Sequence, residues 1–254
     1  MKITDIETTV VYVPYKAPLR WGLGCLPGNT RTVVEISTDE GIAGLGEGFS
    51  EFNKEIIDKY YKPQLLELDP FDVEKIMAKC RWSARWSPRG AHTFSLAAVE
   101  MALWDIIGKA VDKPVCYLIG GKVRDRVEHI GYVWSRYVND QGAGGESTAE
   151  DIAKFASDIV RQYGFKTIEV KLGVFPPKSD IETIRVLRSE LGSDIDIRID
   201  PNKVWSIQTA IRTLRAMEEY DLANIEEPTT TLESMAAVKR HVSAPFSTHD
   251  LNIN

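Results

Sequence analysis

The chain divides into two stretches that differ in hydrophobic periodicity. In the first stretch, runs of β-branched residues predict strands at Lys2 to Val13, Arg31 to Ser37 and Gly41 to Gly48. Helical spacing of apolar residues follows at Asn53 to Leu66, again from Asp69-Pro70, and at Phe94 to Val111. This order predicts a small antiparallel sheet covered by helices, which is an α+β domain over residues 1–125.

In the second stretch, over residues 126–254, short apolar strands alternate strictly with amphipathic helices. The predicted strands are Ile130 to Trp134, Thr167 to Lys171, Asp196 to Asp200, Ala223 to Glu226 and Phe246 to Thr248. The predicted helices between them are Ser147 to Tyr163, Asp180 to Leu191, Ser206 to Tyr220 and Leu232 to His241. Alternating strand and helix units with buried strands predict an α/β fold with a parallel sheet.

The positions of the polar residues favour a barrel over an open sheet. Lys171, Asp200 and Glu226 each lie at the carboxyl end of a predicted strand. In a TIM-type (β/α) barrel these ends converge on one mouth, whereas in an open sheet they spread along an edge. Since no glycine-rich dinucleotide fingerprint follows the first of these strands, a TIM-type barrel is the expected architecture.

Charge and hydropathy exclude several classes of partner. The net charge of −6 argues against nucleic acid and anionic membrane as partners. No apolar run reaches the roughly 20 residues of a membrane span, and the N-terminus reads as a strand rather than a signal peptide. We therefore expect a cytoplasmic protein that acts on a small molecule.

Three carboxylates at the ends of successive strands predict a site for a hard cation. Asp200, Glu226 and Asp250 are separated by 26 and 24 residues, about one strand and helix repeat each. Any one of them alone is better explained as a helix cap or loop acid. Three in register supply the oxygen ligands that Mg²⁺ prefers. Beside such a cation the pKa of Lys171 would fall, which would allow this lysine to act as a general base.

Three motifs in the second stretch, taken together, resemble one family. They are Val170-Lys171-Leu172-Gly173-Val174, Ile199-Asp200-Pro201-Asn202 and Ile225-Glu226-Glu227-Pro228. The chain is thereby similar to the mandelate racemase/muconate lactonizing enzyme type of the enolase superfamily, closest to the glucarate dehydratase-like branch. Gly41 to Gly48 and Ala97 to Pro114 resemble the capping domain of that family, so the resemblance covers the whole chain.

The resemblance implies a Mg²⁺-dependent acid-sugar dehydratase. Mg²⁺ held by Asp200, Glu226 and a third strand-end ligand would bind the substrate carboxylate and stabilise the enediolate formed when the α-proton leaves. The loops at Leu19 to Asn29 and Gly48 to Asn53 would select the substrate. Barrel contacts would come from Asn202, Tyr132 or Trp134, and His249. Two alternatives remain open, a racemase or epimerase of the same superfamily and a catalytically inactive truncated homologue.

Two positions depart from the family pattern. The family places a Lys-x-Lys pair on the second barrel strand, and here the pair reads Glu169-Val170-Lys171. A glutamate at position 169 raises the pKa of Lys171 instead of lowering it. The third ligand is ambiguous by one residue, because the dehydratase pattern favours His249 and the hardness of Mg²⁺ favours Asp250. We expect Asp250.

The length predicts an incomplete barrel. A complete barrel of this type takes about 250 residues, and only 127 residues run from Glu128 to Asn254. We therefore expect strands one to five, without the later strands that carry a second acid/base group in the family. Open parallel edges seek partners, so the chain is expected to form a homo-oligomer or to pair with a complementary barrel half.

Overall fold

The computed structural model describes residues 1–85 and 89–249. The chain forms two compact units. The first contains Met1–Pro14 and Gly28–Asp125, and the second contains Tyr15–Pro27 and Arg126–Asn254.

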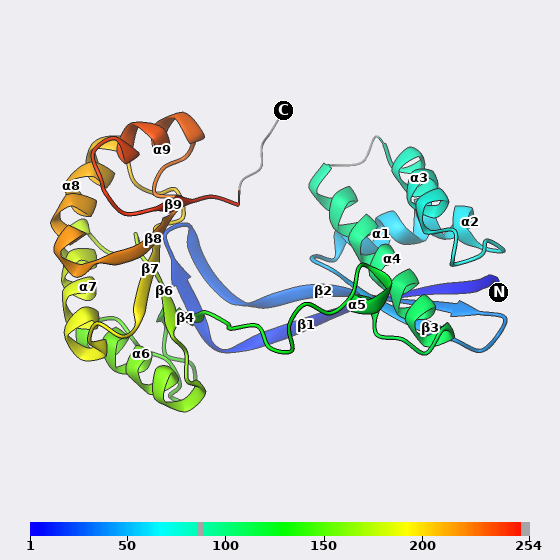
Figure 1. Cartoon of the computed structure of the whole chain (residues 1–254), viewed down its shortest axis with the longest axis horizontal. Helices are drawn as coiled ribbons and strands as arrows, with labels where there is room; N and C mark the ends of the chain where they lie inside the picture. The colour runs from blue at the N-terminus through cyan, green and yellow to red at the C-terminus, as the bar shows by residue number, and fades with distance from the viewer. Residues whose placement is uncertain (86–88, 250–254) are drawn as a thin grey trace. The chain divides into compact units, whose positions relative to one another are not determined.

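The first unit is built on an antiparallel sheet in which β2 lies between β1 and β3. These strands are β1 (Ile3–Trp21), β2 (Gly24–Thr38) and β3 (Ala43–Gly48). The register of β2 against β3 runs from Thr32 opposite Gly48 to Ser37 opposite Ala43. The accompanying helices are α1 (Phe52–Ile56), the π-helix η1 (Ile57–Tyr61), α2 (Lys62–Leu65), α3 (Val73–Ser83), α4 (Arg89–Ala110) and α5 (Val115–Leu118), as Figure 1 shows.

Helix α4 packs closely on β3 because two glycines of that strand face it. A Cβ atom added at Gly46 would lie 1.9 Å from the carbonyl oxygen of Ala98, and one at Gly44 would lie 2.1 Å from that of Ala102.

The single helix predicted from Asn53 to Leu66 is wrong in detail. The structure interrupts it with the π-helix η1, which shifts the helical register between α1 and α2.

The segment Leu19 to Asn29, predicted as a loop, is instead the end of a β-hairpin. Strands β1 and β2 continue through it and are joined at Gly22-Leu23. Strand β5 (Ser135–Arg136) pairs with β1 here, with Leu19 opposite Arg136. Alternating strand periodicity is hidden in this segment by glycine and proline, which read as loop residues in the sequence.

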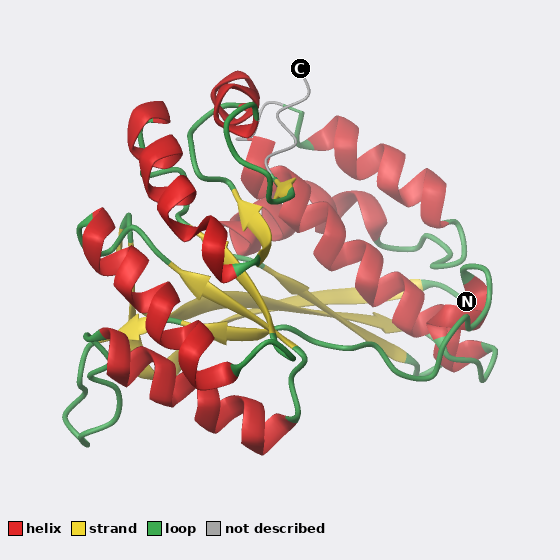
Figure 2. Ribbon diagram, turned by 60° about the vertical axis from the view of Figure 1, so that its left-hand side comes forward, coloured by secondary structure: helices red, strands yellow, loops and turns green. Residues whose placement is uncertain are grey.

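The second unit contains a five-stranded parallel sheet in the order β4, β6, β7, β8, β9. These strands are β4 (Gly131–Val133), β6 (Thr167–Lys171), β7 (Asp196–Asp200), β8 (Leu222–Glu226) and β9 (Phe246–Ser247). The helices of this unit are α6 (Ala149–Tyr163), α7 (Pro177–Leu191), α8 (Ile207–Met217), the 3₁₀-helix η2 (Glu218–Tyr220) and α9 (Leu232–Lys239). Figure 2 shows these alternating elements. The predicted α/β class with a parallel sheet is therefore confirmed.

Alternation along the strands decides which residues face the helices. Ile168, Val170, Ile197, Ile199 and Ile225 are buried in one apolar cluster with residues of the helices. Their neighbours in sequence, which are mostly polar, point to the opposite face of the sheet. Among the helices of the described segments, none is long and apolar enough to cross a membrane.

Candidate active site

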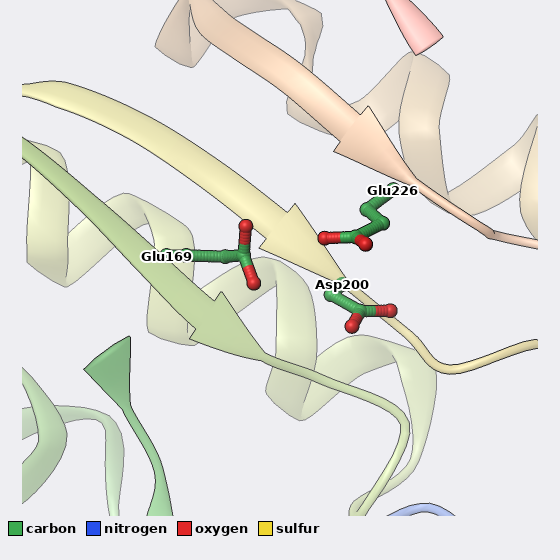
Figure 3. A group of neighbouring side chains, drawn as sticks. All are labelled: Glu169, Asp200 and Glu226. Carbon is green, nitrogen blue, oxygen red and sulfur yellow. The ribbon is translucent and has the colours of Figure 1, made fainter. Parts of the chain in front are cut away.

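The polar face of the sheet gathers acids from three adjacent strands, two of them at the carboxyl ends of their strands. Glu169 comes from β6, Asp200 from the last position of β7 and Glu226 from the last position of β8. Figure 3 shows the three side chains converging from these strands. One carboxylate oxygen of each lies within 4.8 Å of those of the other two. Glu169 and Asp200 are each only 1% exposed, so solvent does little to screen their charges.

Lys171 places a cation against this cluster. Its Nζ lies 3.0 Å from Oε1 of Glu169 and also donates a hydrogen bond to Oδ2 of Asp200. Burial by itself would lower the pKa of Lys171, but the hydrogen bonds and charges of Asp200 and Glu169 outweigh burial and raise this pKa. The side chain is thus held as an ammonium ion in the described structure.

Aromatic rings complete the surroundings of this ammonium ion. Its Nζ lies 5.0 Å from the ring centroid of Tyr132 and 5.5 Å from that of Trp134, distances at which a cation is attracted to the ring faces. Tyr132 therefore lies directly beside Lys171. The pKa of Tyr132 is raised, mainly by burial and then by the negative charge of Glu169.

Asn202 orients the carboxylate of Asp200. Its backbone N–H donates to Oδ1 of Asp200 and its side-chain amide donates to Oδ2, both at 2.7 Å. The backbone of Asn202 has a φ of 51°, a left-handed conformation that asparagine tolerates better than most residues. Among the described residues, the buried side-chain oxygen of Asn202 finds no hydrogen-bond partner. An acceptor at this position can therefore serve a bound molecule.

The three carboxylates form a donor set that fits a divalent cation. Burial first, and then the charges of Glu169 and Asp200, raise the pKa of Glu226. Nε of Arg198 lies 3.3 Å from Oε2 of Glu169. Closely spaced buried carboxylates repel one another, and hard oxygen ligands of this kind bind Mg²⁺ in proteins. The residues present therefore fit the metal expected from the sequence.

Of the two candidates for the third metal ligand, His249 is the one that lies within the described residues. His249 follows β9, and its Nε2 lies 3.8 Å from Oε1 of Glu226 and 3.3 Å from Oε2 of Glu227. Its side chain is 71% exposed. Asp250 lies outside the described residues. Glu227 is buried, and its Oε1 accepts a hydrogen bond from the hydroxyl of Thr248 at 2.6 Å. Its Oε2 lies 3.7 Å from Nζ of Lys203.

The structure brings Lys171, Asp200, Glu226, Asn202 and Tyr132 to one end of the sheet. It adds Glu169 and Arg198, which the sequence interpretation had not placed among the site residues. The signal was available, because residues two apart on a strand share a face. Glu169 therefore accompanies Lys171, and Arg198 accompanies Asp200.

Two family models match most of the chain. Residues 5–120 match the model described as "Mandelate racemase / muconate lactonizing enzyme, N-terminal domain", and residues 151–251 match "Enolase C-terminal domain-like". The first covers most of the first unit, and the second covers β6 to β9.

Individual relatives carry the names of several different enzyme activities. An arabinonate dehydratase from Saccharolobus solfataricus is 30% identical, with 85% of this chain and 58% of the relative covered. A protein from Streptomyces coelicolor named "Probable glucarate dehydratase" is 27% identical, with 88% and 57% covered. Other relatives are cycloisomerases, racemases and epimerases. The chain spans about three fifths of the length of these dehydratase relatives.

Solved structures agree in fold. The crystal structure of an enolase from Thermobispora bispora, complexed with magnesium and formate, superposes with a TM-score of 0.88 at 31% identity. The match covers 98% of this chain and 63% of the other chain. That protein is complexed with both a magnesium ion and the small carboxylate formate.

Proposed function

The chain belongs to the enolase superfamily, of the mandelate racemase and muconate lactonizing enzyme type, and on that premise we propose that it functions as a Mg²⁺-dependent acid-sugar dehydratase. The observation that carries the proposal is a lysine in direct contact with a buried carboxylate cluster at the carboxyl end of a parallel sheet. Two of the relatives named above are dehydratases of sugar acids by their names, which supports this choice.

In this proposal Asp200 and Glu226 hold the metal together with Asp250. Mg²⁺ bound there supplies positive charge for the carboxylate of the substrate as the neighbouring proton is removed. Asn202 keeps both oxygens of the Asp200 carboxylate oriented through its two hydrogen bonds. Fixing the ligand in this way is what residues surrounding a metal site commonly do.

Lys171 acts as the general base. Its Nζ takes the proton from the carbon next to the substrate carboxylate, and the electrons of the broken C–H bond pass toward that carboxylate. The hydroxyl on the following carbon then leaves as water, taking a proton from the Lys171 ammonium group and regenerating the neutral amine, and the resulting enol tautomerises to a 2-keto acid. Lys171 can accept a proton only in its neutral form, so its present ion pairs with Asp200 and Glu169 must weaken before the reaction.

Tyr132, Asn202 and His249 are proposed to contact the substrate. The Tyr132 ring is 52% exposed beside the lysine, so it can face a bound molecule. The unpaired side-chain oxygen of Asn202 can accept a hydrogen bond from a substrate hydroxyl. The exposed imidazole of His249 lies near Glu226, with its Nε2 3.8 Å from Oε1 of that residue. A polyhydroxylated acid offers the hydroxyl groups that such residues recognise.

The sheet offers two open edges for a partner. Within the described residues, β4 and β9 are the outermost strands of the parallel sheet, each with one hydrogen-bonded neighbour. Unpaired strand edges recruit further strands. We propose that a second copy or a complementary barrel half covers them, and light scattering coupled to size-exclusion chromatography measures this directly. A monodisperse monomer would contradict the partner proposal alone.

A product assay tests the dehydratase proposal. Arabinonate and glucarate, with Mg²⁺, are incubated with the chain alone and with a polypeptide that supplies the later barrel strands. The 2-keto acid product is measured as its hydrazone. We expect formation of a keto acid that stops in Lys171→Ala and on chelation of Mg²⁺. A substrate epimerised without any keto acid would contradict the dehydratase assignment while leaving the superfamily assignment intact.

A further inference from the structure

We propose that Glu169 is itself a ligand of the divalent cation, so that β6, β7 and β8 each contribute one carboxylate to the metal. This inference rests on the metal site of the proposed function and deepens it. The motif of the family has lysine at this position, whereas this chain has a buried acid there. The set of carboxylates that we propose as ligands therefore includes a residue at a position where the motif has lysine.

Geometry and burial support a ligand role for Glu169. Its carboxylate shares the 4.8 Å cluster with Asp200 and Glu226, so one ion placed among the three can be reached by an oxygen of each. Glu169 is 1% exposed, so positive charge beside it, at present the Lys171 ammonium and the Arg198 guanidinium, must offset the cost of burying its carboxylate. Glu169 would then hold the metal in addition to the ligands of the proposed function, Asp200, Glu226 and Asp250.

The position of Lys171 identifies where a cation is favoured. Its ammonium group contacts Glu169 and Asp200 at the same time, and so stands in for the metal between two of the three acids. Arg198 lies 3.3 Å from the other oxygen of Glu169, and among the described residues its Nε makes no hydrogen bond. Two single cations thus face three carboxylates. If the three carboxylates held a divalent ion, that ion would replace the ammonium group in these contacts, and the Lys171 side chain would be free to face the substrate.

A simpler role for Glu169 makes different predictions. If Glu169 only holds Lys171 in place, then removing its charge leaves metal affinity unchanged. Affinity could also rise, because the competing ammonium ion would be held less firmly. The number of water molecules on the bound ion would then stay the same. Affinity and water count together therefore separate a ligand from a positioning residue.

The experiment uses Mn²⁺ as a probe of the site, since it prefers the same oxygen ligands as Mg²⁺. Binding to the full chain is measured by electron paramagnetic resonance, and the waters on the bound ion are counted by water-proton relaxation. We compare the wild type with Glu169→Gln, Glu169→Asp and the matched control Glu227→Gln. Glu227 is an equally buried acid at the same end of the sheet and lies outside the three-carboxylate cluster.

We expect Glu169→Gln to weaken Mn²⁺ binding roughly tenfold or more and to add one water to the bound ion. Glu169→Asp keeps the charge but withdraws the carboxylate, so it should also add a water. Glu227→Gln should leave the water count unchanged. Equal or tighter binding by Glu169→Gln with an unchanged water count would overturn the inference. A wild type that binds no Mn²⁺, or an Asp200→Ala variant that binds normally, would instead overturn the proposed metal site and the inference with it.

Discussion

Asp180 should make the second unit less stable as the pH rises from about 4 to about 7. This aspartate lies in the first turn of α7, is 2% exposed and accepts a hydrogen bond from the backbone N–H of Gly173 at 3.2 Å. Burial raises its pKa from 3.8 to about 7, despite that hydrogen bond. The folded chain therefore keeps the proton up to about pH 7, whereas the unfolded chain releases it near pH 4.

The sign and size of the effect follow from this difference. Between these two pH values the unfolded state binds fewer protons, so the free energy of unfolding falls with rising pH. The slope is about 1.4 kcal/mol per pH unit, which amounts to roughly 4 kcal/mol over the interval. Asp180→Asn removes the titration but keeps an oxygen that can accept from Gly173. It should therefore match the wild type near pH 4 and be several kcal/mol more stable near pH 8.

The assay must report on the second unit alone. Urea unfolding of the wild type, Asp180→Asn and the control Asp194→Asn is carried out at pH 4.5 and 7.5. Amides of β6 and β7 are then pulse-labelled with deuterium at one fixed pH. Asp194 is an exposed acid of the same unit. An equal change of stability with pH in the wild type and Asp180→Asn would refute the assignment of a raised pKa to this carboxyl.

Three further predictions concern the metal, the packing of the first unit and the lysine. Mg²⁺ at about one hundred times its dissociation constant should stabilise the chain by ~2.7 kcal/mol, and Asp200→Ala should abolish the rise in melting temperature; an unchanged rise would remove Asp200 from the metal site. Gly46→Ala should destabilise the first unit by ~1 to 3 kcal/mol or more, because the new methyl would meet the Ala98 carbonyl; a melting temperature equal to that of the wild type would contradict this packing. Glu169→Lys should lower the pKa of Lys171 by replacing an attractive charge with a repulsive one, so the alkaline-dependent rise of proton exchange should move to lower pH; an unmoved profile would show that Glu169 does not act on Lys171.

The sequence predicts the second unit better than the first, and the reason is periodicity. Predicted bounds for β6 and β7 coincide with the observed strands, because apolar residues alternate cleanly between Thr167 and Lys171 and between Asp196 and Asp200. Capping residues also mark helix starts, since Thr148 accepts from the N–H of Asp151 at the start of α6. The helix predicted from Ser147 begins at Ala149 in the structure, so its start is predicted to within two residues.

Features that depend on contacts distant in sequence were not predictable in the same way. The continuation of β1 and β2 through Gly22-Leu23 depends on pairing with β5, more than 100 residues later in the chain. Added at Gly22, a Cβ atom would lie 2.4 Å from Val204, so the hairpin also depends on a residue of the β7–α8 loop. The inclusion of Glu169 in the site follows from its spacing from Lys171. Because Glu169 was interpreted only as a departure from the Lys-x-Lys motif, its place among the site residues was not predicted.

Solvent deuterium exchange tests the central claim most directly, because it reports removal of the α-proton whether or not water is lost afterwards. Arabinonate or glucarate is held in D₂O with Mg²⁺ and the chain, alone and with a polypeptide that supplies the later barrel strands, and the α-proton signal is followed by NMR. The account predicts Mg²⁺-dependent loss of that signal, slowed by ~10² to 10⁴ in Lys171→Ala. Exchange at the wild-type rate in Lys171→Ala would contradict it.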